Sequence, residues 1–83
     1  MTLPTQPVTL TVQQIGELNE VLSTMRHDIN NSLSLMIAAT ELIRHKPQMA
    51  ERMAATLTEQ PPKITDSMQK FSAAFEQMLS ISH

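Results

Sequence analysis

The chain of 83 residues has no cysteine, a single glycine and only two aromatic side chains, and each shortage excludes a class of protein. Without cysteine, neither a disulfide framework nor a thiolate metal site can support a small fold. The apolar residues do not alternate with polar ones, and aromatic residues are few, which argues against strands. Hydrophobic residues still make up 41% of the chain, and methionine occurs seven times. This composition predicts one all-α domain.

Strong charge and long hydrophobic runs are also missing. The formal net charge is -2, so the chain carries no electrostatic signature of nucleic-acid or anionic-membrane binding. No apolar run approaches the roughly 18 residues of a membrane span, and the first ten residues lack the basic start of a leader. The histidines at positions 27, 45 and 83 lack metal-ligand spacing, so no metal site is expected. We therefore expect a soluble, cytoplasmic protein with no nucleic-acid or membrane partner.

A long first helix is predicted after a short arm. Residues 1–10 contain Pro4 and Pro7 and are expected to form an extended N-terminal arm. Thr11 and Gln14 have the spacing of a capping box, and a heptad pattern of apolar residues continues from there to about Arg44. The two seam positions of this heptad hold Ile15, Leu22, Ile29, Met36 and Ile43, and Leu18, Met25, Ser32 and Ala39.

The returning helix is predicted in two pieces. A short connection from His45 to Gln48 makes the second helix antiparallel to the first. This second helix should stop near Glu59, because two successive prolines disfavour helical backbone, and a further helical segment should start near Pro62. Residues 11–83 are thus expected to form an antiparallel helical hairpin whose second helix is broken at Pro61-Pro62. Since two helices leave their apolar stripes uncovered, we expect two copies to form a homodimeric four-helix bundle.

His27 lies in the middle of the first helix, opposite the seam, where an exposed imidazole is expected. Asn31 follows it by four residues and is its neighbour on the helix surface, and Asp28 and Asn31 are three residues apart. An exposed neutral imidazole on a rigid helix suits phosphoryl transfer, and the carboxylate of Asp28 could hold a ring proton. The simpler alternative is a solvated surface histidine without a chemical role.

The stretch His27-Asp28-Ile29-Asn30-Asn31-Ser32-Leu33 resembles the H-box of sensor histidine kinases, and residues 12–83 resemble their dimerisation and histidine-phosphotransfer domain. The resemblance implies that His27 is the phosphoacceptor, that Asp28 is the neighbouring acid or base, and that Asn31 positions water during dephosphorylation of a response regulator. By the same analogy, Ser34, Leu35 and Ala38 are expected to bind the receiver domain. Many members have a kink-forming proline where this chain has Ser32, and we hypothesise that Pro61-Pro62 supplies the bend instead.

The ATP-binding domain of such kinases, with its glycine-rich and asparagine motifs, has no counterpart in this chain. No cofactor of its own is expected, and ATP and Mg²⁺ would act only through partner domains. Whether the chain is an enzyme stays open between a kinase fragment, a substrate of an ATP-binding kinase domain on another chain, and a stand-alone histidine phosphotransferase. The predicted function is two-component phosphotransfer between His27 and a response-regulator aspartate. The alternative is a structural dimerisation or interaction module with an unused H-box.

Overall fold

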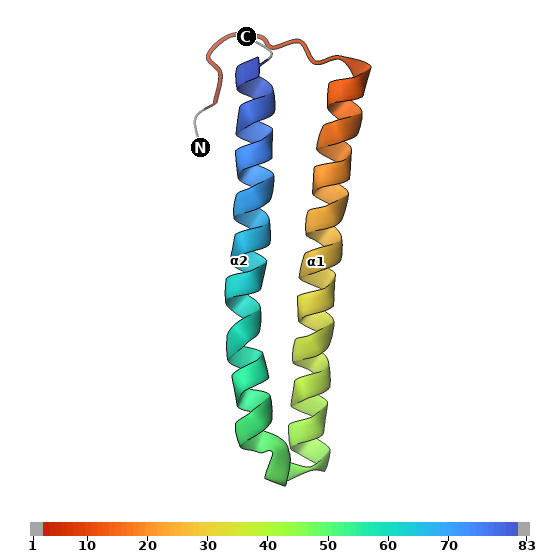
Figure 1. Cartoon of the computed structure of the whole chain (residues 1–83), viewed down its shortest axis with the longest axis vertical. Coiled ribbons are helices and arrows are strands. Elements are labelled where there is room, and N and C mark those ends of the chain that lie inside the picture. The colour runs from red at the N-terminus through yellow and green to blue at the C-terminus, as the bar shows by residue number, and fades with distance from the viewer. Residues whose placement is uncertain (1–2, 82–83) are drawn as a thin grey trace.

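The computed structural model describes residues 3–81 and consists of two antiparallel helices joined by a short turn (Figure 1). Helix α1 spans Val12–His45, the 3-10 turn η1 spans Pro47–Met49, and helix α2 spans Ala50–Ile81. The molecule is a rod with principal extents of 56 × 22 × 13 Å. Residues 3–81 contain no strand, so the predicted all-α hairpin is confirmed at the level of one chain.

Helix α1 begins with the predicted capping box. The Thr11 hydroxyl oxygen accepts a hydrogen bond from the Gln14 amide at 3.1 Å, and the Thr11 amide donates to Gln14 Oε1 at 2.8 Å. Two backbone donors that the first helical turn leaves without partners are thereby satisfied. The arm before the cap has no regular secondary structure over residues 3–11 and passes across the open end of the hairpin (Figure 1).

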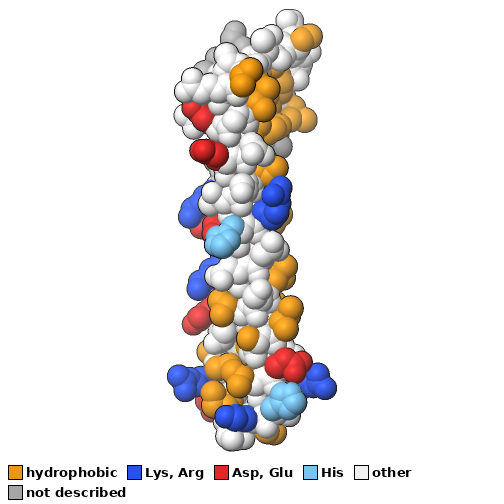
Figure 2. All heavy atoms as spheres, turned by 90° about the vertical axis from the view of Figure 1, so that its right-hand side faces the viewer, with side chains coloured by type: hydrophobic (Ala, Val, Ile, Leu, Met, Phe, Trp, Pro, Cys, Tyr) orange, Lys and Arg blue, Asp and Glu red, His pale blue; other side chains and the backbone are white. Residues whose placement is uncertain are grey.

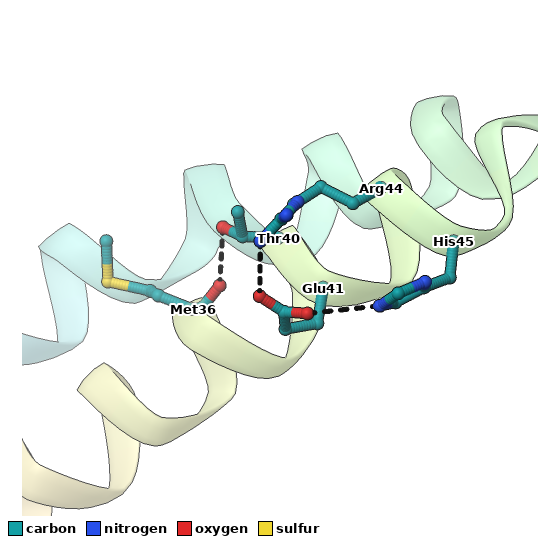
Figure 3. Close-up of polar contacts among 5 residues, drawn as sticks. All are labelled: Met36, Thr40, Glu41, Arg44 and His45. Carbon is teal, nitrogen blue, oxygen red and sulfur yellow. Dashed lines mark hydrogen bonds and ion pairs between the residues drawn. The ribbon is translucent and has the colours of Figure 1, made fainter.

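The far end of α1 is held by contacts within its last turns. Glu41 binds Arg44 at 3.1 Å and His45 at 3.3 Å, and the Thr40 hydroxyl donates to the Met36 carbonyl at 2.9 Å (Figure 3). These ion pairs are exposed and contribute little to stability, but the basic residues suit the negative end of the helix dipole. The helix ends at His45, one residue beyond the predicted position, and Pro47 starts the turn.

Helix α2 does not break at its two prolines, and the predicted interruption is therefore wrong. The helix continues through Pro61 and Pro62 (Figure 1), although neither residue can donate a backbone hydrogen bond. Both proline rings are exposed, whereas the preceding Gln60 is buried, so the rings project away from α1. Packing of the opposite face thus overrides a local preference against helix of about 3 kcal/mol per proline. The hypothesis that Pro61-Pro62 supplies the bend otherwise made by a proline at the position of Ser32 is therefore also wrong.

The interface between the helices is thin. In the part of the chain that the structure describes, three side chains are almost fully buried: Ser32 is 4% exposed, Ala39 2% and Gln60 2%. The predicted seam is largely confirmed, because its other members are half-buried, with the exception of exposed Ile15. One hairpin therefore leaves large hydrophobic side chains exposed, among them Leu33 and Ile37 at 44% and 66%. Neither helix within residues 3–81 has an apolar stretch long enough to cross a membrane.

Candidate functional site

His27 projects from the middle of α1 and is exposed, as its place opposite the heptad seam predicted. Among residues 3–81 its imidazole has no hydrogen-bond or ion-pair partner. The outward face of α1 carries mainly polar and charged side chains along its middle, while hydrophobic side chains gather toward the two ends (Figure 2). The ring is therefore available to a group that approaches from solvent.

Asp28 and Asn31 lie closer to α2 than His27 does. Both line a cleft of about 240 Å³ between the two helices, whereas His27 lies just outside it on the same side of α1. The structure has no hydrogen bond between Asp28 and the His27 imidazole, because adjacent helical residues point roughly 100° apart. The three predicted residues are thus neighbours, but Asp28 and Asn31 belong to the cleft and His27 to its rim.

Helix α2 supplies the opposite wall of this cleft. Its contributions are Lys63, Asp66, Ser67 and Lys70, which face Asp28, Asn31 and Ser32 of α1. Asp66 and Lys70 form an ion pair of 3.1 Å across one turn. Lys63 has no carboxylate partner within the described residues. We call the hollow between these α2 residues and Asp28, Asn31 and Ser32 of α1 the polar cleft.

The polar cleft continues toward the open end of the hairpin. A second hollow of about 250 Å³ shares Asp28, Ser67 and Lys70 with it, and its other lining residues are both polar and apolar: Glu20, Val21, Thr24, Met25 and Phe71. Because Asp28 and Ser67 line both hollows, Asp28 lies opposite the part of α2 around Ser67. A turn centred at residue 46 would place residues near Thr65 opposite His27, whereas the connection runs from Lys46 through η1 to Met49, so its centre lies beyond residue 46.

The other edge of the interhelical groove has the opposite chemistry. Leu33, Met36 and Ile37 of α1 line a hollow of about 400 Å³ together with Leu57 of α2. A further hollow of about 230 Å³ is formed by Ile15, Leu18, Asn19 and Leu22 with Phe71. Asn31 and Leu33 are two residues apart and so point roughly 200° apart around α1. The groove therefore has a polar edge beside His27 and an apolar edge on the other side.

The residues expected to bind a receiver domain are accessible. Ser34, Leu35 and Ala38 are all exposed, and Leu35 is 42% exposed. Leu42, which is 37% exposed, follows Leu35 by seven residues on the same strip of α1. Along α1 this strip lies between His27 and the turn, and it begins directly after Asn31 and Ser32, which line the polar cleft.

Sequence reasoning missed the α2 wall of the cleft. Lys63, Ser67 and Lys70 recur at intervals of four and three, which marks one strip of the helical segment predicted from Pro62, but the sequence did not show that this strip faces Asp28 of α1. Which strip of α2 meets α1 depends on the hairpin register, and the length of η1 sets that register.

A metal site is not formed by the described residues. They contain no group of three or more histidine, aspartate or glutamate side chains placed to hold an ion. His45 instead contacts Glu41, and His83 lies outside the described residues. The site is thus one exposed imidazole beside a polar cleft that contains both charge signs.

Comparison of the chain with protein-family models, with curated proteins and with solved structures gives no match.

Proposed function

We propose that this protein is a two-component phosphotransfer module in which His27 carries a phosphoryl group and exchanges it with an aspartate of a response-regulator receiver domain. The observation that carries the proposal is the position of His27. It lies midway along a 34-residue helix, is exposed, and has no partner among the described residues. The H-box resemblance of residues 27–33 supports the same role.

The transfer step follows from the chemistry of imidazole. A lone pair on a neutral ring nitrogen of His27 attacks the phosphorus of the aspartyl phosphate in line with the P–O bond. The N–P bond forms as the P–O bond breaks, and its electron pair leaves with the aspartate carboxylate. The other ring nitrogen keeps its proton, and a rotation of the Asp28 side chain would let its carboxylate accept a hydrogen bond from that N–H. Mg²⁺ would be supplied by the receiver domain.

The partners follow from the two sides of the hairpin. We propose that a second copy covers the apolar edge, because Leu33, Ile37 and Leu57 would otherwise stay in contact with water. The receiver domain would bind Ser34, Leu35 and Ala38 below His27. An ATP-binding kinase domain, on another chain or on a part of the protein outside this sequence, would supply the phosphoryl group, and we propose that the exchange takes place in the cytoplasm.

A decisive experiment is incubation of the purified chain with a phosphorylated receiver domain, followed by mapping of acid-labile phosphate. We expect label on His27 and none in His27→Gln. His45→Gln is the matched control, since His45 is also an exposed histidine on α1 and should leave labelling unchanged. A folded chain that takes no label from several phosphorylated receivers, nor from kinase ATP-binding domains, would overturn the proposal.

Two observations favour a second function, a structural dimerisation module. The apolar edge exists independently of His27, and no carboxylate within residues 3–81 is hydrogen-bonded to the imidazole. This alternative predicts a stable dimer in which His27 is never phosphorylated.

A further inference from the structure

The polar cleft contains a cation that has no partner within the described residues. Of the two lysines in the α2 wall, Lys70 is bound to Asp66 at 3.1 Å, whereas Lys63 has no ion pair. Asp28 lines the same cleft and likewise lacks a cation within ion-pair distance. Lys63 is therefore the ammonium group that can bind an added anion without breaking an existing pair.

The cleft places Lys63 next to the surface strip that carries His27. Asn31 follows His27 by one helical turn and lines the cleft together with Lys63, so Lys63 borders the same hollow as the histidine's neighbour. The side chain of lysine is a compact charge on a flexible four-carbon stem, which lets it follow a group attached to a nearby ring. The amide of Asn31 provides a second donor on the same strip.

The charges of the cleft would change if His27 carried a phosphoryl group. Asp28 and Asp66 are balanced formally by Lys63 and Lys70, so the empty cleft has no net charge. A phosphoryl group brings close to two negative charges at neutral pH, and Asp28 lies next to His27 in the chain. Lys70 already pairs with Asp66, which leaves Lys63 as the cleft's unpaired cation to offset the repulsion from Asp28.

We infer that Lys63 of α2 binds the phosphoryl group carried by His27 of α1, with the Asn31 amide as a neighbouring donor. This inference rests on the proposed function of His27 and adds to it a positioning residue from the other helix. Lys63 forms no covalent bond. It stabilises the phosphorylated form of His27 relative to the phosphorylated receiver.

The test is the equilibrium of phosphoryl exchange between the 83-residue chain and a phosphorylated receiver domain, measured for the unmodified chain and for Lys63→Gln. We expect Lys63→Gln to lower the ratio of phosphohistidine to aspartyl phosphate about ten-fold, the loss of one charge-assisted hydrogen bond. Lys63→Arg should restore most of this ratio. Lys46→Gln is the control, because Lys46 is an exposed lysine at the turn and does not line the cleft.

Three outcomes separate the possibilities. Equal exchange equilibria in Lys63→Gln and Lys46→Gln, with label present on His27, would overturn the role of Lys63 and leave the proposed function intact. Absence of label on the unmodified chain would overturn both. A ten-fold shift in Lys63→Gln alone, with an unchanged melting temperature and helix content, supports the inference, because a merely structural lysine would not alter the exchange equilibrium.

Discussion

Gln60 and Thr56 are joined by a hydrogen bond of 3.3 Å from the Gln60 amide nitrogen to the Thr56 carbonyl, and this bond satisfies only one end of a buried amide. The other end, the side-chain oxygen Oε1, has no partner among the described residues, and Gln60 is only 2% exposed, so water does not reach this oxygen. A buried acceptor without a donor lowers stability, since water satisfies it in the unfolded chain.

Gln60→Leu is therefore expected to raise the free energy of unfolding by about 1 kcal/mol, because it removes the unsatisfied oxygen and keeps the volume. Chemical denaturation followed by circular dichroism measures the change. Gln69→Leu is the control, since Gln69 is exposed on the same helix and should change stability by less than about 0.5 kcal/mol. A loss of stability in Gln60→Leu would mean that the amide oxygen has a partner in solution.

The prolines of α2 give a second prediction. Replacing Pro61 and Pro62 together by alanine restores backbone donors to the carbonyls of Leu57 and Thr58 in a helix that already continues through them. We expect a gain in unfolding free energy of roughly 2 kcal/mol or more, because proline in a helix interior costs about 3 kcal/mol relative to alanine. Pro47→Ala serves as the control: Pro47 begins η1, where a missing donor costs little. An equal gain in both variants would contradict a continuous helix at residues 61–62.

These prolines also show where local sequence signals fail. The start of α1 was predictable because the capping box of Thr11 and Gln14 is a contact within one turn, and the end at Pro47 was predictable because proline cannot continue that helix. At Pro61 and Pro62 the same local rule predicts a break, but the helix continues, with the half-buried side chains of Leu57 and Ile64 on either side of the prolines. Tertiary packing decides such positions, and a single sequence does not report it directly.

In the candidate site, too, some features could be predicted from the sequence and others could not. Exposure of His27 and the proximity of Asn31 follow from helical periodicity alone. The position of Lys63 and its neighbours in the polar cleft does not follow from periodicity, because it depends on how many residues the connection between the helices contains. A shift of three residues along α2 is almost one helical turn, which brings different side chains to the cleft.

Ala39 marks the close approach of the helices and gives a third prediction. Ala39→Leu should lower the free energy of unfolding by about 1–3 kcal/mol, because a larger side chain has no room at a position that is 2% exposed. The adjacent Ala38 is exposed, so Ala38→Leu is a control with the same chemical change. Thermal unfolding of both variants measures the difference, and equal melting temperatures would refute the packing described for Ala39.

Two leucines of nearly equal exposure test the two edges separately. Leu33 is 44% exposed on the apolar edge, and Leu35 is 42% exposed on the strip proposed for the receiver domain. We expect Leu33→Lys to weaken self-association at least ten-fold, because it places a charge in a hydrophobic interface. Leu35→Lys should leave self-association unchanged.

Sedimentation equilibrium measures self-association in both variants, and exchange of phosphate with a receiver domain measures docking. Leu35→Lys should slow that exchange while the protein stays dimeric. If Leu33→Lys left the association constant unchanged and Leu35→Lys lowered it, the second copy would have to bind the opposite edge from the one proposed.

The separation of a polar edge from an apolar edge has a consequence for stoichiometry. Any two-fold assembly that covers Leu33, Ile37 and Leu57 at its axis turns the two polar clefts outward, away from each other. A ligand bound at one cleft then does not obstruct the other. Such a dimer would bind two receiver domains at once, and each subunit would saturate with its own simple binding curve.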